Sequence, residues 1–163
     1  MRFVLEITPE VHTAILGAMI RSLPNEGCGL LTARSQHSLV DHFHAAPNGA
    51  ASPTRFVVDP QTLLDVERDA EASGREVVAI VHSHVDTSPY PSATDVADAQ
   101  VYDPAGHYLQ VIVSLRHAEP ELRCFRIERG LVTEILVTMG DGDPAVGDGA
   151  GAIAAVRQLP PRS

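Results

Sequence analysis

The sequence predicts an α/β domain in which a mixed β-sheet is flanked by helices. Three observations lead to this prediction. Short apolar runs of strand length alternate with longer stretches of helical periodicity, an order typical of layered α/β domains. Residues 77–81 are wholly apolar, as expected of a central strand that is buried on both faces. Gly130 separates two further strand-like runs, as the turn of an antiparallel hairpin does, so parallel and antiparallel pairs are both expected.

The first half of the chain is expected to contain two helices. Thr8 and Pro9 have the residue types of an N-cap and a first helical residue, and that helix is expected to end near Ser22. A second helix over 60–73 begins after an aspartate in the same way and is expected to turn Leu64 inward, together with three other apolar residues of the same face. The strands expected here cover residues 3–7, 26–32, 39–46 and 55–58.

The second half is expected to begin with the central strand and to end with three more strands. A helix from Ser92 to about Tyr102 separates them. We expect residues 1–139 to form one domain, and residues 140–163, rich in Gly, Ala and Pro, to form a disordered tail with a short helix near 150–158. The strands expected here cover residues 76–84, 108–115, 122–128 and 131–138.

Composition excludes several classes of function. The net charge of -9 argues against nucleic-acid binding, because phosphate contacts require a basic face. No stretch approaches the length of an apolar membrane span, and the first residues do not resemble a signal peptide. Two cysteines make no disulfide framework, so a reduced, cytoplasmic setting is the expectation.

The stretch from His82 to Asp95 carries the chemistry. His82 and His84 follow a buried strand two residues apart, so their side chains should leave it on one face. A proline-rich loop then leads to a helix start at Ser92, which places Asp95 in the first turn. Two imidazoles and one carboxylate form a three-ligand set for zinc with the fourth position open. The alternative is a pair of ordinary strand-end histidines followed by a helix capping box.

A second histidine pair shows that the His-x-His spacing alone is weak evidence. His42 and His44 have the same spacing in another expected strand. No helix start returns a carboxylate to them, so we interpret this pair as sheet surface.

The combination of His82-Ser83-His84, a spaced Ser92-x-x-Asp95 and an upstream glutamate resembles the JAMM motif of the MPN+ metallopeptidases. Val85 stands where that family usually carries proline, which affects the shape of the loop and not the set of ligands. Tyr90-Pro91-Ser92-x-Thr94-Asp95, with Glu26-x-Cys28-Gly29 upstream, is similar to the small bacterial JAMM peptidases of the CysO-cysteine peptidase group. The resemblance covers roughly residues 3–137 and implies the layered, cytidine-deaminase-like MPN fold.

The resemblance also implies roles for individual residues. His82, His84 and Asp95 would hold one Zn²⁺ per chain, although iron or cobalt could occupy the same ligands. Glu26 would act as the general base, and the Ser92 hydroxyl would stabilise the oxyanion. The capping role of Ser92 is compatible with this, although one hydroxyl proton cannot serve both roles fully. The implied substrate is a ubiquitin-like sulfur-carrier protein. The bond after its C-terminal Gly-Gly would be hydrolysed, with release of cysteine or of a short extension.

Several alternatives remain open from the sequence. Cys28 could be the nucleophile of a cysteine peptidase, although the Ser-x-x-Asp return has no part in that chemistry. The domain could be a non-catalytic MPN scaffold, or an isopeptidase acting on ubiquitin-like conjugates. Asn48 and Arg55 could line a substrate groove or only build a loop. The oligomeric state, a homodimer included, is also open.

Overall fold

The computed structural model describes residues 3–141, so all but the first two residues of the tail expected over 140–163, and the short helix expected near 150–158, lie outside the described residues. The strands and helices within residues 3–141 follow the predicted order closely. They are β1 Val4–Ile7, α1 Pro9–Arg21, β2 Cys28–Arg34, β3 Leu39–Ala46, α2 Pro60–Ala72, β4 Arg75–His84, α3 Ala93–Tyr102, β5 Leu109–Ser114, β6 Glu121–Glu128 and β7 Leu131–Met139.

The strands form one mixed sheet in the order β1-β3-β2-β4-β5-β6-β7. The pairs β1–β3, β1–β7 and β4–β5 are parallel, and the remaining pairs are antiparallel. The prediction of a mixed sheet is therefore confirmed. The closure of this sheet into a barrel was not expected, and it arises because the short strand β1 pairs with β3 on one edge and with β7 on the other.

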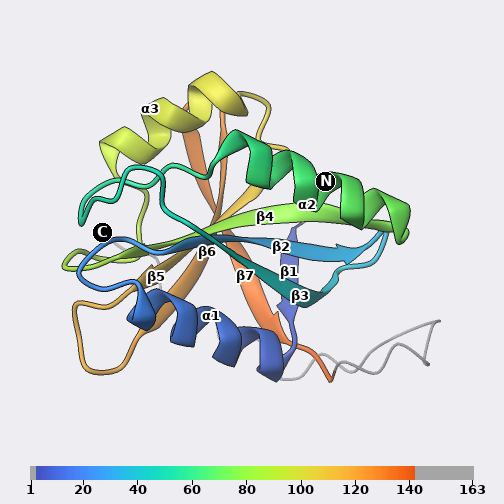
Figure 1. The fold of residues 1–163 in the computed structure, drawn as a ribbon, viewed down its shortest axis with the longest axis horizontal. Helices are drawn as coiled ribbons and strands as arrows, with labels where there is room; N and C mark the ends of the chain where they lie inside the picture. The colour runs from blue at the N-terminus through green and yellow to red at the C-terminus, as the bar shows by residue number, and fades with distance from the viewer. Residues whose placement is uncertain (1–2, 142–163) are drawn as a thin grey trace.

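The helices cover two sides of the sheet, with α1 on one side and α2 and α3 on the other (Figure 1). Helix α1 begins where Thr8 accepts a hydrogen bond from the amide of Val11 (3.1 Å), as its N-cap position predicts. The apolar face of α1 packs into the core together with the inner residues of β2, β3, β4 and β5. Helix α2 is less buried than expected: Ala70 is its one buried residue, and Leu64 is 39% exposed, contrary to the prediction.

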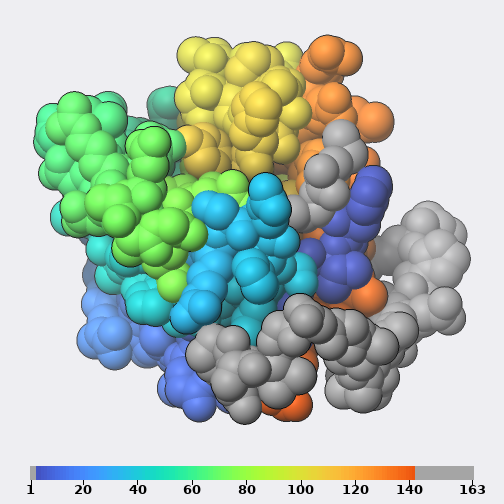
Figure 2. Space-filling view, turned by 90° about the vertical axis from the view of Figure 1, so that its right-hand side faces the viewer, coloured from blue at the N-terminus to red at the C-terminus, as the bar shows by residue number. Residues whose placement is uncertain are grey.

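Two tight turns lie at the ends of the barrel strands. Arg129 and Gly130 have φ values of 49° and 80°, the left-handed conformation that a tight β6–β7 hairpin requires, and the predicted turn is confirmed. At the end of β2, the amide of Ser35 donates to the carbonyl of Gly74 (3.1 Å), so the β2–β3 turn lies beside the α2–β4 turn. Figure 2 views the molecule from this end. No helix within residues 3–141 is both long and apolar enough to span a membrane.

Candidate metal centre

The two histidines of the motif lie at the end of the central strand β4, as predicted. This strand pairs with β2 on one side and with β5 on the other, and its last seven residues, Val78 to His84, are buried. Alternation along the strand turns His82 and His84 to one face and Ser83 to the opposite face. The Nε2 atoms of His82 and His84 lie 3.1 Å apart.

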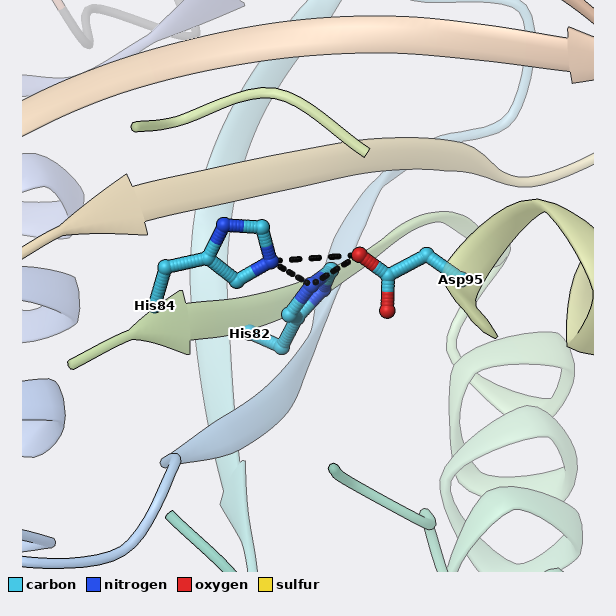
Figure 3. Close-up of side chains that lie close together, drawn as sticks. All are labelled: His82, His84 and Asp95. Carbon is cyan, nitrogen blue, oxygen red and sulfur yellow. Dashed lines mark hydrogen bonds and ion pairs between the residues drawn. The ribbon is translucent and has the colours of Figure 1, made fainter. Parts of the chain in front are cut away.

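Asp95 completes the group from the first turn of α3. Its carboxylate oxygen Oδ2 lies 3.3 Å from Nε2 of His82 and 3.1 Å from Nε2 of His84. Figure 3 shows the two rings and the carboxylate pointing toward one another. The position of Asp95 is fixed by a reciprocal capping box, in which Ser92 Oγ accepts from the Asp95 amide (3.0 Å) and the Ser92 amide donates to Oδ2 (2.8 Å). The structure thus combines the capping box with a His-His-Asp group that could hold a metal ion, which the sequence presented as alternatives.

The chemistry of these three side chains fits a cation. Nδ1 of His84 lies 2.7 Å from the carbonyl oxygen of Ser88, which can only accept, so we assign the ring hydrogen to Nδ1. In the neutral ring, Nε2 of His84 then presents a lone pair toward the carboxylate of Asp95. One ligand atom from each of the three residues lies within 4.8 Å of the others. Such a set of converging acceptors is the arrangement of a three-ligand zinc site.

The ionisable groups of the site shift one another's pKa values. In the metal-free site burial alone would raise the pKa of Asp95, but the hydrogen bonds that His82 and His84 donate from Nε2 when their rings are protonated outweigh it and hold the pKa well below its usual range. Burial lowers the pKa of His82. Burial also acts to lower the pKa of His84, but the hydrogen bonds to Asp95 and to the Ser88 carbonyl raise it overall. An ionised carboxylate therefore faces two imidazoles, of which His82 favours the neutral form that binds metals.

Glu26 lies beside this group in a water-poor position. The residue is 4% exposed, and its Oε2 is buried without a hydrogen-bond partner among the residues that the structure describes. Burial raises the pKa of Glu26 to about 7, while the charges of His84 and Asp95 act in opposite directions. A carboxyl group with a pKa near neutrality can both accept and return a proton, which is the property required of a general base.

Ser83 fixes the backbone that carries Glu26. Its Oγ accepts a hydrogen bond from the Gly27 amide (2.8 Å), and its own amide donates to the Gly27 carbonyl (3.0 Å). Ser83 is fully buried. The residue between the two histidines therefore couples the Glu26 segment to β4, a role that the sequence analysis did not assign.

The expectation of a strand over residues 55–58 is wrong. Only an isolated bridge between Asn48 and Val58 forms there. The side chain of Asn48 instead makes four hydrogen bonds. It donates to the carbonyls of Glu26 (3.0 Å) and Arg55 (2.9 Å). It accepts from the amides of Ala50 (2.9 Å) and Val57 (3.0 Å). Asn48 therefore builds a loop. Because the side-chain amide of Asn48 pairs with backbone groups that a strand would use, residues 55–58 stay irregular.

This loop places an aromatic ring over the site. Phe56 stacks on His82 with ring centroids 4.1 Å apart and planes inclined by 14°. Nδ1 of His82 is buried with no partner among residues 3–141, so ring stacking orients His82 where a hydrogen bond would usually do so. Arg55, the neighbouring residue, pairs with Asp98 of α3 at 3.3 Å. Sequence reasoning missed Phe56, because no local pattern indicates that an aromatic residue in a loop will fold back onto a strand end.

The loop over residues 85–91 is attached to the barrel at three points. Ser114 donates from Oγ to the carbonyl of Thr87 (2.6 Å), and His84 donates to the carbonyl of Ser88. The ring of Tyr90 meets Phe125 edge-on, with centroids 5.2 Å apart. The backbone around His84 is therefore held in place even though Val85 replaces the usual proline of the motif.

Cys28 has the environment of a structural thiol. It is buried, and its Sγ lies 3.5 Å from the carbonyl oxygens of Ala46 and Pro47. Burial, assisted by the charge of Glu26, raises the pKa of Cys28 to about 11. The thiol therefore stays protonated near neutral pH, which argues against the nucleophile interpretation.

Comparison with known proteins is consistent with this geometry. A family profile described as "Prokaryotic homologs of the JAB domain" matches residues 8–128. The CysO-cysteine peptidase of Mycobacterium tuberculosis (strain ATCC 25618 / H37Rv) is 35% identical over 132 residues, which cover 81% of this chain and 88% of that protein. The desampylase of Haloferax volcanii is 36% identical over 73 residues, covering 44% and 52%. The solution structure of protein DSY2949 from Desulfitobacterium hafniense superposes with a TM-score of 0.76 at 28% identity, covering 84% of this chain and 93% of that one.

Proposed function

This chain belongs to the prokaryotic homologues of the JAB domain and is a hydrolase of the JAMM peptidase type; we propose that it acts with zinc on a ubiquitin-like sulfur-carrier protein. The bond hydrolysed is the amide that follows the C-terminal Gly-Gly of the carrier, with release of cysteine. The observation that carries the proposal is the convergence of His82, His84 and Asp95 beside the buried carboxyl of Glu26.

Two imidazole nitrogens and one carboxylate would hold the zinc ion and leave its fourth position open. Bound there, zinc would supply Lewis acidity and make water a stronger acid at neutral pH. In the metal-free site His82 and His84 hold Asp95 ionised, and a bound zinc ion would stabilise the same charge when the imidazoles bind the metal. The stack of Phe56 on His82 keeps the ring oriented and keeps water away from that side of the site.

Glu26 is the proton carrier of the proposed reaction. It accepts a proton from the attacking water and transfers it to the nitrogen of the departing cysteine as the amide bond breaks. The hydroxyl of Ser92 donates to the oxygen of the scissile carbonyl, on which negative charge develops. Capping does not prevent this, because Ser92 Oγ accepts a hydrogen bond from Asp95 and so keeps its own proton available.

The identity of the leaving group rests on the relatives. The mycobacterial relative, aligned over most of both chains, is named for CysO-cysteine, so cysteine on a carrier protein is the preferred substrate. The haloarchaeal desampylase supports a second candidate function, the removal of a ubiquitin-like modifier from another protein. Both reactions use the same site and differ in the group that leaves.

Mass spectrometry of a carrier protein ending in Gly-Gly-Cys would test the proposal. We expect the zinc-loaded enzyme to reduce the carrier mass by one cysteine residue. Glu26→Gln should retain zinc and lose turnover, since it removes the proton carrier and not a ligand. The same carrier joined through its terminal glycine to a lysine side chain tests the second candidate. Full activity of Glu26→Gln would refute the assignment of the base.

A further inference from the structure

A pocket that includes charged and polar side chains lies on the sheet face that α2 covers, away from the candidate metal centre. It has a volume of about 570 Å³, within the range of small-molecule sites. We propose that this pocket binds a small oxyanion, that is, a molecule carrying a phosphate or a carboxylate group. Its lining residues come from β2, β3, the end of α2, the α2–β4 turn and the start of β4: Thr32, Arg34, His42, His44, Asp69, Ala70, Ser73, Gly74 and Arg75.

Two guanidinium groups form the basic part of the pocket. Arg34 and Arg75 are direct partners in the antiparallel pairing of β2 with β4, and like charges in that position repel each other. Burial and the charge of Arg34 both lower the pKa of Arg75. Arg75 pairs with Asp41, but its Nε is buried without an acceptor among residues 3–141. Arg34 is exposed, and no carboxylate of the described chain lies within ion-pair distance of it. An anion between the two guanidinium groups would relieve the repulsion.

The remaining polar groups suit the same ligand. The rings of His42 and His44 are stacked 6.3 Å apart, His42 Nδ1 lies 3.0 Å from Asp41, and His44 Nε2 lies 3.1 Å from Thr32 Oγ1. Guanidinium, imidazole and hydroxyl groups are the usual donors to phosphate and carboxylate. Asp69 is the single acidic residue of the lining, and because Asp41 already pairs with Arg75, Arg34 supplies the charge that would meet an anion. The second histidine pair, interpreted from the sequence as plain sheet surface, thus becomes part of a pocket.

This pocket is separate from the proposed catalytic site. Cys28 at one end of β2 pairs with His82, and Arg34 at the other end pairs with Arg75. Six residues of extended strand separate the two ends by roughly 20 Å. The proposal therefore does not depend on the peptidase function. Because the chain has a net charge of -9, anions are repelled in general, and saturable anion binding would indicate a local site.

Isothermal titration of the zinc-loaded protein with inorganic phosphate, and separately with succinate, tests the proposal. Sodium chloride keeps the ionic strength constant. We expect at least one of the two anions to bind saturably. Arg34→Gln should weaken that binding by about tenfold or more, as expected for a lost charge-assisted hydrogen bond. Asp69→Asn should strengthen the binding, because it removes the opposing charge. Both residues are exposed, so the fold should be preserved.

Arg21→Gln is the matched control, since Arg21 is an exposed arginine on α1, which covers the other side of the sheet. Its affinity should equal that of the wild type. Phosphate binding alone would assign the pocket to phosphorylated ligands, and succinate binding alone to carboxylates. The proposal is overturned if neither anion saturates the wild type. It is also overturned if Arg34→Gln binds as tightly as the wild type, because the anion would then occupy another place, such as the metal centre.

Discussion

Removing the charge of Glu26 should change how the stability of the metal-free protein depends on pH. The pKa of Glu26 is about 7 in the folded chain and 4.5 when unperturbed. When the pKa of an acid is higher in the folded chain than in the unfolded chain, its protonation stabilises the folded state. This contribution is fully present below the unfolded-state pKa and is lost as pH rises through the folded-state pKa. Each unit of difference corresponds to about 1.4 kcal/mol, so the wild type should lose about 2.5 kcal/mol between about pH 5 and pH 8 through this group.

Urea unfolding of the chelator-treated protein over this pH range provides the assay. Glu26→Gln has no charge to bury, so its free energy of unfolding should exceed that of the wild type by a margin that grows with pH. Glu71→Gln, at an exposed position of α2, should follow the wild-type curve. Restored zinc should reduce the difference, because a nearby cation favours the ionised form of Glu26. Parallel curves for wild type and Glu26→Gln would refute the argument that this carboxyl is buried.

Three further substitutions test the surroundings of the site. Ser114→Ala removes the hydrogen bond that holds the 85–91 loop, and zinc affinity measured by chelator competition should fall about tenfold, as for other residues that support a ligand. Cys28→Ala should leave turnover of the carrier within about twofold and cost about 1–2 kcal/mol in urea unfolding, because this thiol is a packing group; loss of turnover in a folded variant would revive the nucleophile interpretation. Phe56→Leu removes the ring stacked on His82, so zinc should dissociate faster in stopped-flow chelation, and an unchanged rate would mean that the stack does not orient this histidine.

The sequence predicted the positions of the helices and strands well wherever the local signals were strong. Thr8-Pro9 and Ser92-x-x-Asp95 are capping patterns whose hydrogen bonds form within four residues, and the structure contains both. The pair His82 and His84 was placed correctly because strand alternation is a property of the backbone itself. These features depend on neighbours in sequence, which is why they can be predicted without a structure.

Other features depend on contacts between distant segments. Closure of the barrel requires β1 to pair with both β3 and β7. The four residues of β1 contain no local pattern that predicts either pairing. Residues 55–58 have the composition of a strand, but the four hydrogen bonds of Asn48 hold them in a loop. The role of Ser83, and the pocket formed around His42, likewise become visible only when strands far apart in sequence lie side by side.

The metal content of the purified protein shows whether His82, His84 and Asp95 form a metal site. The protein would be purified without chelator or added metal, and its metal content measured beside that of Asp95→Ala. We expect about one zinc ion per chain in the wild type and its loss in the variant, as for a site of three protein ligands. If the wild type stays free of metal after zinc is supplied, or if the variant retains as much zinc, these three residues do not form a zinc site.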